Sequence, residues 1–175
     1  MQIGANTKFP KHLGKIPETV KVPDGNVFKF VLYGIGVYDF KFNASESTWK
    51  ICKSETFFVN YPQDLSSFNA SSIVVTTSST ALDQCGNTHN GAIKSLIPGD
   101  TSFATGQSVA FEYDAKSNVV RWYLGKIKTS QGVFSDITYI LGYFNSKHDL
   151  SEGSYPDGYV RSISVDITAL YYGKE

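Results

Sequence analysis

The sequence has neither an excess of charge of one sign nor a long apolar run. Each of these absences argues against a class of protein. Its 16 basic residues are matched by 16 acidic ones, so the formal net charge is zero. No basic field attracts the phosphate backbone of a nucleic acid, and nucleic acid is not an expected partner. No apolar run approaches the roughly 20 residues that cross a bilayer, so we expect no membrane span.

The sequence also lacks any stretch with the periodicity of an amphipathic helix, while aromatic residues are abundant. They make up 14% of the chain, with 11 Tyr and 12 Phe. Val, Ile, Thr, Tyr and Phe favour pleated, half-buried surfaces. A chain of 175 residues is of a size that folds around a single hydrophobic core. A single all-β domain is therefore expected.

Alternation of apolar and polar residues marks the expected strands. Within residues 26–43, six apolar side chains of one parity are predicted to share a face: Phe28, Phe30, Leu32, Tyr38, Phe40 and Phe42. Gly34 and Gly36 interrupt this stretch and predict a bulge or a bend. Two later stretches alternate in the same way: Val120, Trp122 and Leu124, and then Ile163, Val165, Ile167 and Ala169.

This pattern predicts an antiparallel β-sandwich or barrel of about nine or ten strands in a single domain. Residues 1–25 contain three prolines and four lysines, and we expect them to form an extended N-terminal arm. Residues 26–175 are expected to form the β-sandwich domain.

Cys52 and Cys85 are the two cysteines of the chain. In an oxidising compartment they can form one disulfide, which would hold the loop around Cys85 against the strand that contains Cys52. By the loop-entropy argument this bond would contribute roughly 3–4 kcal/mol. A disulfide between two molecules and a pair of reduced thiols remain open as alternatives.

Residues 85–91, CGNTHNG, place a cysteine and a histidine in a turn of Gly, Asn and Thr. Structural zinc usually needs four ligands in closely spaced pairs, and Cys85 with His89 is the only close pair, so no metal site is expected. A Cys–His nucleophile needs an orienting third residue, which the sequence does not mark, so no catalytic site is expected. Asn87, His89 and Asn90 define a candidate functional loop, in which Gly and Asn allow unusual backbone angles.

The compartment is suggested by two N-glycosylation sequons, at Asn43 and Asn69. Sequons suit an exported or vacuolar protein, although the first residues show no apolar segment typical of a signal peptide. The Gly-Ile-Gly stretch at residues 34–36 lacks the rest of a dinucleotide fingerprint. We therefore expect a vacuolar or secreted protein with no cofactor.

Three ordered motifs carry a family resemblance. They are VPDG…GVYDFKF…W, then LDQCGNTHNG, and finally VVRWYLGKIKTSQGVFSDITYI…YPDG…VDITALYYG. From about residue 17 to 173, the chain resembles a domain family of unknown function found in bacteria and fungi. Its members are small, exported β-rich proteins that are often mislabelled malate dehydrogenase. This chain has no βαβ unit to support that label, and it lacks the cysteine expected after VYDF.

Within this family the chain is similar to the matrix protein of octahedral vacuolar crystals of fungi, which sediment and act in gravity sensing. The resemblance implies a non-enzymatic structural protein whose partner is itself, in a homo-oligomer or a crystal lattice. Zero net charge is compatible with this function, because weak charge repulsion favours association. The alternative is a secreted module that binds a glycan or the cell wall. An enzyme that uses Cys85 and His89 is the third hypothesis.

Overall fold

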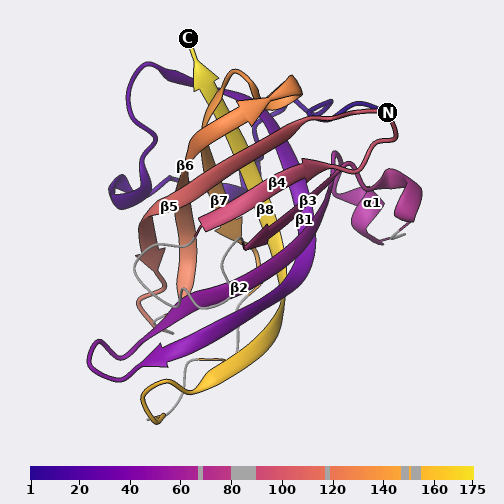
Figure 1. Cartoon of the computed structure of the whole chain (residues 1–175). Coiled ribbons are helices and arrows are strands. Elements are labelled where there is room, and N and C mark those ends of the chain that lie inside the picture. The colour runs from indigo at the N-terminus through magenta and orange to yellow at the C-terminus, as the bar shows by residue number, and fades with distance from the viewer. Residues whose placement is uncertain (67–68, 80–89, 117–118, 147–149, 151–154) are drawn as a thin grey trace.

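Eight antiparallel strands form one closed barrel, in which each strand pairs with its neighbours in the sequence and β1 pairs with β8 (Figure 1). The all-β antiparallel fold expected from the sequence is confirmed. It is a barrel and not a sandwich, and it has eight strands where about nine or ten were expected. The computed structural model describes residues 1–66, 69–79, 90–116, 119–146, 150 and 155–175.

The strands differ greatly in length. Their bounds are β1 (Asn26–Asn43), β2 (Thr48–Val59), β3 (Val75–Ser79), β4 (Asn90–Ser95), β5 (Phe103–Tyr113), β6 (Val120–Gln131), β7 (Ile137–Phe144) and β8 (Val160–Lys174). Among the described residues, helical turns are limited to α1 (Gln63–Ser66), η1 (Lys11–Leu13), η2 (Glu18–Val20), η3 (Ala70–Ser72) and η4 (Gly132–Phe134). Because β3 and β4 are short, the ends of β1, β2 and β8 extend past them in Figure 1.

The alternation predicted for β8 is confirmed. Val165, Ile167 and Ala169 are buried in the interior core, and Ile163 packs against the same core. The polar residues between them share the other face, because successive side chains of a strand point to opposite sides of the sheet.

Two of the other predicted strand faces are wrong, because bulges change the side of the sheet to which the residues point. The pairing of β1 with β8 shifts between Phe28 and Phe30, so Phe28 packs with the outer cluster, 6.0 Å from the ring of Tyr172, whereas Phe30 lies in the interior core. A shift in the pairing of β5 with β6 likewise separates Val120, which is inside, from Trp122, which is outside with Leu124. One extra residue in a strand reverses the facing of everything beyond it.

Gly34 and Gly36 are not at a bulge, so that alternative was wrong, and the bend stays a prediction. Both pair with β2 and β8 without a register shift. Glycine is needed here because side chains from β2 cross over the backbone of β1. A Cβ at Gly34 would lie 2.6 Å from the ring of Phe58, which is closer than carbon atoms approach.

The N-terminal 25 residues cover part of the outer wall and reach the interior. Leu13 and Val20 are buried in an outer cluster with Trp122, Leu141 and Leu170. Burying a Leu or Val side chain contributes on the order of 1.5–3 kcal/mol. Ile3, by contrast, belongs to the interior core, so the segment closes part of the barrel as well as covering it.

Asn60 anchors the start of the chain. Its Oδ1 accepts a hydrogen bond from Ala5 N at 3.1 Å, its Nδ2 donates to Gln2 O at 2.9 Å, and its carbonyl accepts from Asn6 Nδ2 at 3.0 Å. Asn60 is buried, so these bonds replace water that is excluded there. The N-terminal segment is thereby held at a fixed position against the residue that follows β2.

We predict that Asn60→Ala lowers the free energy of unfolding by about 1–3 kcal/mol, because two side-chain hydrogen bonds are lost and their partners stay unsatisfied. Urea denaturation measures this loss, and hydrogen exchange at residues 2–6 should accelerate. Asn60→Asp keeps an acceptor for Ala5 N but buries a carboxylate against Gln2 O, so it should not restore the stability that Asn60→Ala loses. Unchanged exchange at residues 2–6 would contradict the anchoring role.

Candidate functional site

The barrel interior contains a cavity of about 80 Å³ that is partly open to solvent, and all eight strands contribute lining residues. Its walls are mainly apolar and include Ile51, Phe58, Ile93, Ile127 and Ile140. None of the described residues that line it is Asp, Glu, Lys, Arg or His. A water molecule occupies roughly 10–15 Å³ on this kind of measure, so the space holds several waters or one small molecule.

Three glycines hollow out one wall of the cavity. Gly91, Gly106 and Gly125 lie on the adjacent strands β4, β5 and β6 and all line the cavity, and Gly91 pairs directly with Gly106. A Cβ at Gly125 would meet its nearest atom, Ile140 O, at 3.7 Å, and one at Gly91 would meet Ser78 O at 3.5 Å. The protein could therefore accommodate larger residues at Gly91 and Gly125. Glycine inside a strand weakens it and often marks a close approach by a ligand or another backbone.

A cluster of hydroxyl groups lies on β1, β2 and β6. The Tyr38 hydroxyl forms hydrogen bonds with those of Thr56, Ser54 and Tyr123, and of these residues Tyr38, Ser54 and Tyr123 line the cavity. Tyr123 reaches this position by lying over Gly142, where a Cβ would overlap the tyrosine ring. A polar patch is thus built into a mainly apolar interior.

Thr56 is the unusual member of this region. It lies between Ser54 and Phe58 on the inward face of β2, and it is fully buried. Its Oγ1 lies outside ordinary hydrogen-bond geometry to the other described residues, but its interaction with the Tyr38 hydroxyl lowers the pKa of Tyr38 against the raising effect of burial. Thr56 therefore belongs to the same hydroxyl cluster, and it is not among the residues that line the cavity.

Burial controls the acid–base behaviour of the tyrosines. Burial raises the pKa of Tyr38 to about 12, against the lowering effect of the hydroxyls of Thr56, Ser54 and Tyr123. Burial also raises the pKa of Tyr123 and of Tyr171, and the nearby Tyr38 adds to both shifts. These phenols are therefore neutral hydrogen-bonding groups at physiological pH.

We predict that the barrel loses stability between about pH 10 and pH 12. A raised folded-state pKa stabilises the fold fully below the unfolded pKa of 10, and this contribution is lost as the pH rises through the folded value. For Tyr38 the loss approaches roughly 3 kcal/mol. Urea denaturation at pH 8, 10 and 11.5 measures it. Tyr38→Phe should reduce the pH dependence without abolishing it, because burial also raises the pKa of Tyr123 and Tyr171, and the surface variant Tyr61→Phe is the matched control.

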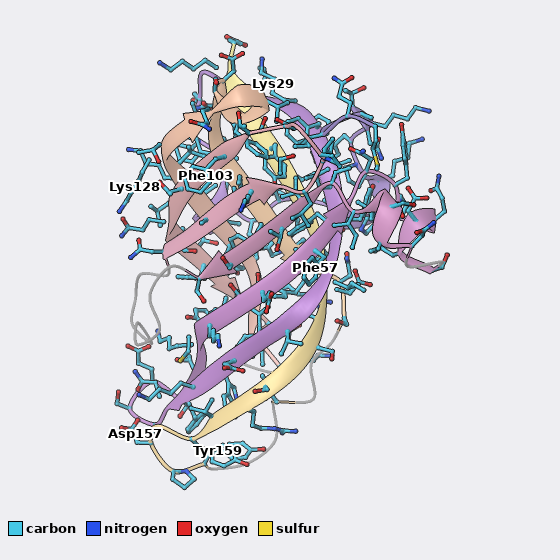
Figure 2. The ribbon with its side chains drawn as sticks, turned by 45° about the vertical axis from the view of Figure 1, so that its right-hand side comes forward. Lys29, Phe57, Phe103, Lys128, Asp157 and Tyr159 are labelled. Atoms are coloured by element: carbon cyan, nitrogen blue, oxygen red, sulfur yellow. The ribbon has the colours of Figure 1, made fainter. Side chains whose placement is uncertain are left out.

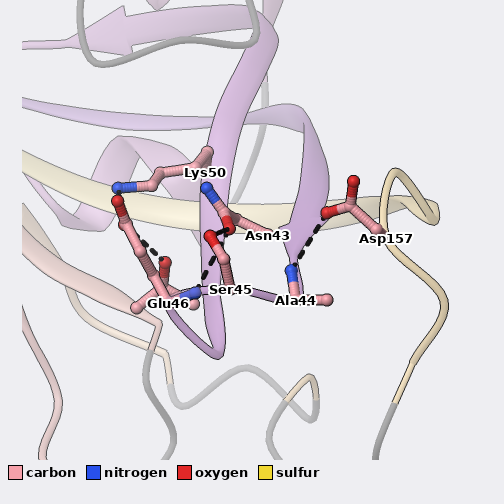
Figure 3. A network of polar contacts seen from close by, with 7 residues as sticks. Asn43, Ala44, Ser45, Glu46, Lys50 and Asp157 are labelled. Carbon is pink, nitrogen blue, oxygen red and sulfur yellow. Dashed lines mark hydrogen bonds and ion pairs between the residues drawn. The ribbon is translucent and has the colours of Figure 1, made fainter.

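A second cavity of about 260 Å³ lies beside the first and shares Ile51 with it. Lys50 lines it, with its Nζ 2.6 Å from Glu46 Oε2 (Figure 3) and 5.6 Å from the centre of the Tyr113 ring. The ion pair with Glu46 already neutralises the ammonium group. This cavity therefore offers less to a charged ligand than the presence of a lysine suggests.

The candidate loop is only partly described. Cys52 is buried and disulfide-bonded, but Cys85, Asn87 and His89 lie outside the described residues, so the pairing of Cys52 with Cys85 stays a prediction. Asn90 begins β4 and pairs with Gln107. The structure therefore places Asn90 within the barrel wall.

The two sequon asparagines belong to different turns. Asn43 ends β1, and its Oδ1 accepts hydrogen bonds from Ser45 Oγ at 2.6 Å and from Glu46 N at 3.2 Å (Figure 3). Asn69 precedes η3 and accepts from Ser71 N at 3.1 Å. Both asparagines organise their turns, and glycosylation of either one stays a prediction.

An aromatic pair in which Tyr159 is exposed and Tyr155 is partly buried against the core bears on the predicted glycan partner. The rings of Tyr155 and Tyr159 stack at 5.4 Å with an angle of 14° between their planes. Tyr159 lies at the end of the molecule opposite Lys29 (Figure 2) and is 44% exposed. Exposed aromatic faces are able to stack on sugar rings, but a glycan partner stays a prediction.

Comparisons with protein-family models, curated proteins and solved structures find no match for this chain. The family resemblance given by the sequence motifs therefore stays a prediction. In the described part of the chain, no three His, Cys, Asp or Glu side chains gather to hold a metal ion. The helices among these residues are all too short or too polar to cross a membrane.

Sequence reasoning missed the cavity and its hydroxyl groups. Tyr38 was expected on the core face of its strand, and it lies there, but nothing predicted that Thr56 and Tyr123 would join it. The only signal was the glycine content of the strands. Gly36 and Gly142 mark the backbone positions over which Thr56 and Tyr123 pack, yet a glycine does not reveal which side chain crosses it.

Proposed function

We propose that this protein is a non-enzymatic binding protein that holds one small, mainly apolar molecule inside its barrel. The glycine-hollowed cavity carries this proposal, because larger residues would fit at Gly91 and Gly125 and would fill it. Small-molecule sites are concave, mostly apolar and equipped with a few placed polar groups. Eight-stranded barrels have interiors of the size that side chains fill or that one small ligand occupies.

The chemistry of the lining supports binding over catalysis. General acid–base catalysis is most effective when a group titrates near the working pH. The described lining has no carboxylate, histidine or amine, and burial raises the pKa of its tyrosines Tyr38, Tyr123 and Tyr171. Such groups orient a ligand by hydrogen bonding without exchanging protons with it.

We predict that the double variant Gly91→Ala, Gly125→Ala folds but loses ligand binding. Two methyl groups would enter the cavity without a steric clash, and replacing glycine in a strand stabilises by roughly 0.5–1 kcal/mol per site. With benzene as the probe, isothermal titration calorimetry should show saturable binding to the wild type and binding at least about ten-fold weaker to the variant.

The control for this experiment is Val133→Ala, a change at a partly exposed residue outside the cavity lining. It should leave probe affinity unchanged. Equal benzene affinity in the wild type and the double glycine variant would show that the probe binds elsewhere, and the proposal would then fail.

Self-assembly is the second candidate function, and two exposed valines on β1 and β8 favour it. Val37 on β1 and Val160 on β8 are each 50% exposed, although they lie within paired strands. Asp39 and Lys41 lie near them in β1, and the whole chain has zero net charge. A surface with exposed valines and both signs of charge suits contact with a second copy. The resemblance adds vacuolar crystals as the assembled form.

We predict that, if the surface around Val37 and Val160 is the contact, Val37→Lys will convert the oligomer to a monomer. A buried lysine without a partner opposes association strongly. Size-exclusion chromatography with light scattering, with and without reductant, measures the mass. Val133→Lys, at another exposed valine, is the matched control. A monomeric wild type at every concentration would rule out self-assembly.

A further inference from the structure

We infer that the molecule held in the barrel cavity is uncharged and carries an oxygen, such as a carbonyl oxygen, that accepts a hydrogen bond from the hydroxyl of Tyr171. This inference rests on the binding function proposed above and assigns the chemical class of the ligand. It is carried by the placement of Tyr171, which lines the cavity and is only 1% exposed. Its hydroxyl forms no hydrogen bond with another described residue.

The packing of Tyr171 fixes the direction in which it points. The residue lies on the inward face of β8, where the preceding inward residue, Ala169, also lines the cavity. Its ring stacks with the rings of Phe30, at 4.5 Å between centroids, and of Phe134, at 5.9 Å. Neither phenylalanine is among the lining residues. Tyr171 therefore meets the cavity with the part of its ring that these two side chains leave free.

The hydroxyl end of the ring is the end that faces the cavity. Burial raises the pKa of Tyr171, and the nearby Tyr38 adds to this shift. Burial likewise raises the pKa of Tyr123, to which Tyr38 and Tyr171 both add. The three phenol oxygens therefore lie near one another, and Tyr38 and Tyr123 are themselves lining residues.

The Tyr171 hydroxyl differs from its neighbours because it is unpaired and still within reach of a ligand. Tyr38 and Tyr123 form a hydrogen bond with each other. Among the described residues, Thr56 Oγ1 is the buried atom that lacks both a hydrogen bond of ordinary geometry and any accessible surface. The hydroxyl of Tyr171 is not enclosed in that way. Leaving a buried hydroxyl unpaired is costly, and a molecule in the cavity would relieve that cost.

The protonation state of Tyr171 and the character of the lining decide what the ligand carries. Because burial raises the pKa of Tyr171, the phenol keeps its proton and donates a hydrogen bond. The described lining contains no charged side chain, and burying an ion without an opposite charge is costly, so the accepting oxygen belongs to a neutral molecule. Apolar walls that include Ile127 and Ile140 suit a hydrocarbon body, which a cavity of about 80 Å³ limits to a few carbon atoms or a single ring.

Three probes with the same number of non-hydrogen atoms separate these features. Cyclohexanone has a carbonyl oxygen that only accepts hydrogen bonds, toluene has no polar atom, and cyclohexylamine is a cation at pH 7. Isothermal titration calorimetry should show that the wild type binds cyclohexanone and toluene, and that cyclohexylamine binds more weakly than either. Infrared spectroscopy of bound cyclohexanone should show a carbonyl stretch at a lower frequency than in hexane, because a hydrogen bond weakens the C=O bond.

Tyr171→Phe tests the contact, because it removes the hydroxyl and keeps the ring. Binding of cyclohexanone should become about ten-fold weaker, which corresponds to one hydrogen bond, while binding of toluene stays the same. The melting temperature of the free variant should stay equal or rise, because an unpaired polar group is removed. The matched control is Tyr172→Phe. Tyr172 is buried in the outer cluster and lies outside the lining, so this change should leave the affinity for both probes unaltered.

The outcomes distinguish this inference from the binding function. If Tyr171→Phe leaves cyclohexanone binding unchanged, or weakens cyclohexanone and toluene equally, the hydroxyl contact is overturned while the cavity remains a binding site. Tighter binding of cyclohexylamine would overturn the uncharged class. If neither cyclohexanone nor toluene binds the wild type, the binding function itself fails. A carbonyl stretch at its hexane frequency in the wild type overturns the contact even if Tyr171→Phe does not fold.

Discussion

The pairing of β1 with β8 is the constraint on which the rest of this structure depends. It extends from Asn26 to Lys41 on β1 and joins the first strand to the last, so the sheet closes and its interior has a set volume. In an eight-stranded barrel that volume is nearly filled by side chains. Any local shortage of side-chain volume therefore stays as empty space, because the paired strands cannot move inward to fill it. The glycines of β4, β5 and β6 create such a shortage.

Closure of the barrel also determines that polar groups in its interior need hydrogen-bond partners within the protein. Hydroxyls enclosed by the sheet have no bulk water, so each one needs a partner or carries a desolvation cost. Tyr38, Ser54 and Tyr123 meet this need together, and burial keeps the phenols neutral by raising the pKa of Tyr38 and Tyr123. Thr56 joins this cluster through its interaction with the Tyr38 hydroxyl.

The outer surface of the barrel is partly covered by the N-terminal segment. Apolar side chains that bulges turn outward, such as Phe28 and Trp122, are covered by neighbours that include Leu13 and Val20 of the N-terminal segment. Asn60 holds the first residues of that segment in place. The apolar residues that stay exposed, among them Val37 and Val160, lie outside the cover. In the self-assembly proposal a second copy binds at these residues, so the two proposed functions use different faces of the same sheet.

The sequence by itself determined the fold class, because alternation over long stretches is compatible only with strands, and it placed Ile167 and Ala169 correctly on the core face of β8. It did not determine which face Phe28 takes, because an added residue at a bulge reverses the alternation without changing the local pattern. Only the tertiary structure decided that the sheet closes with eight strands and that Tyr123 and Thr56 meet Tyr38. Those contacts join strands far apart in the chain, and their register depends on closure rather than on any local preference.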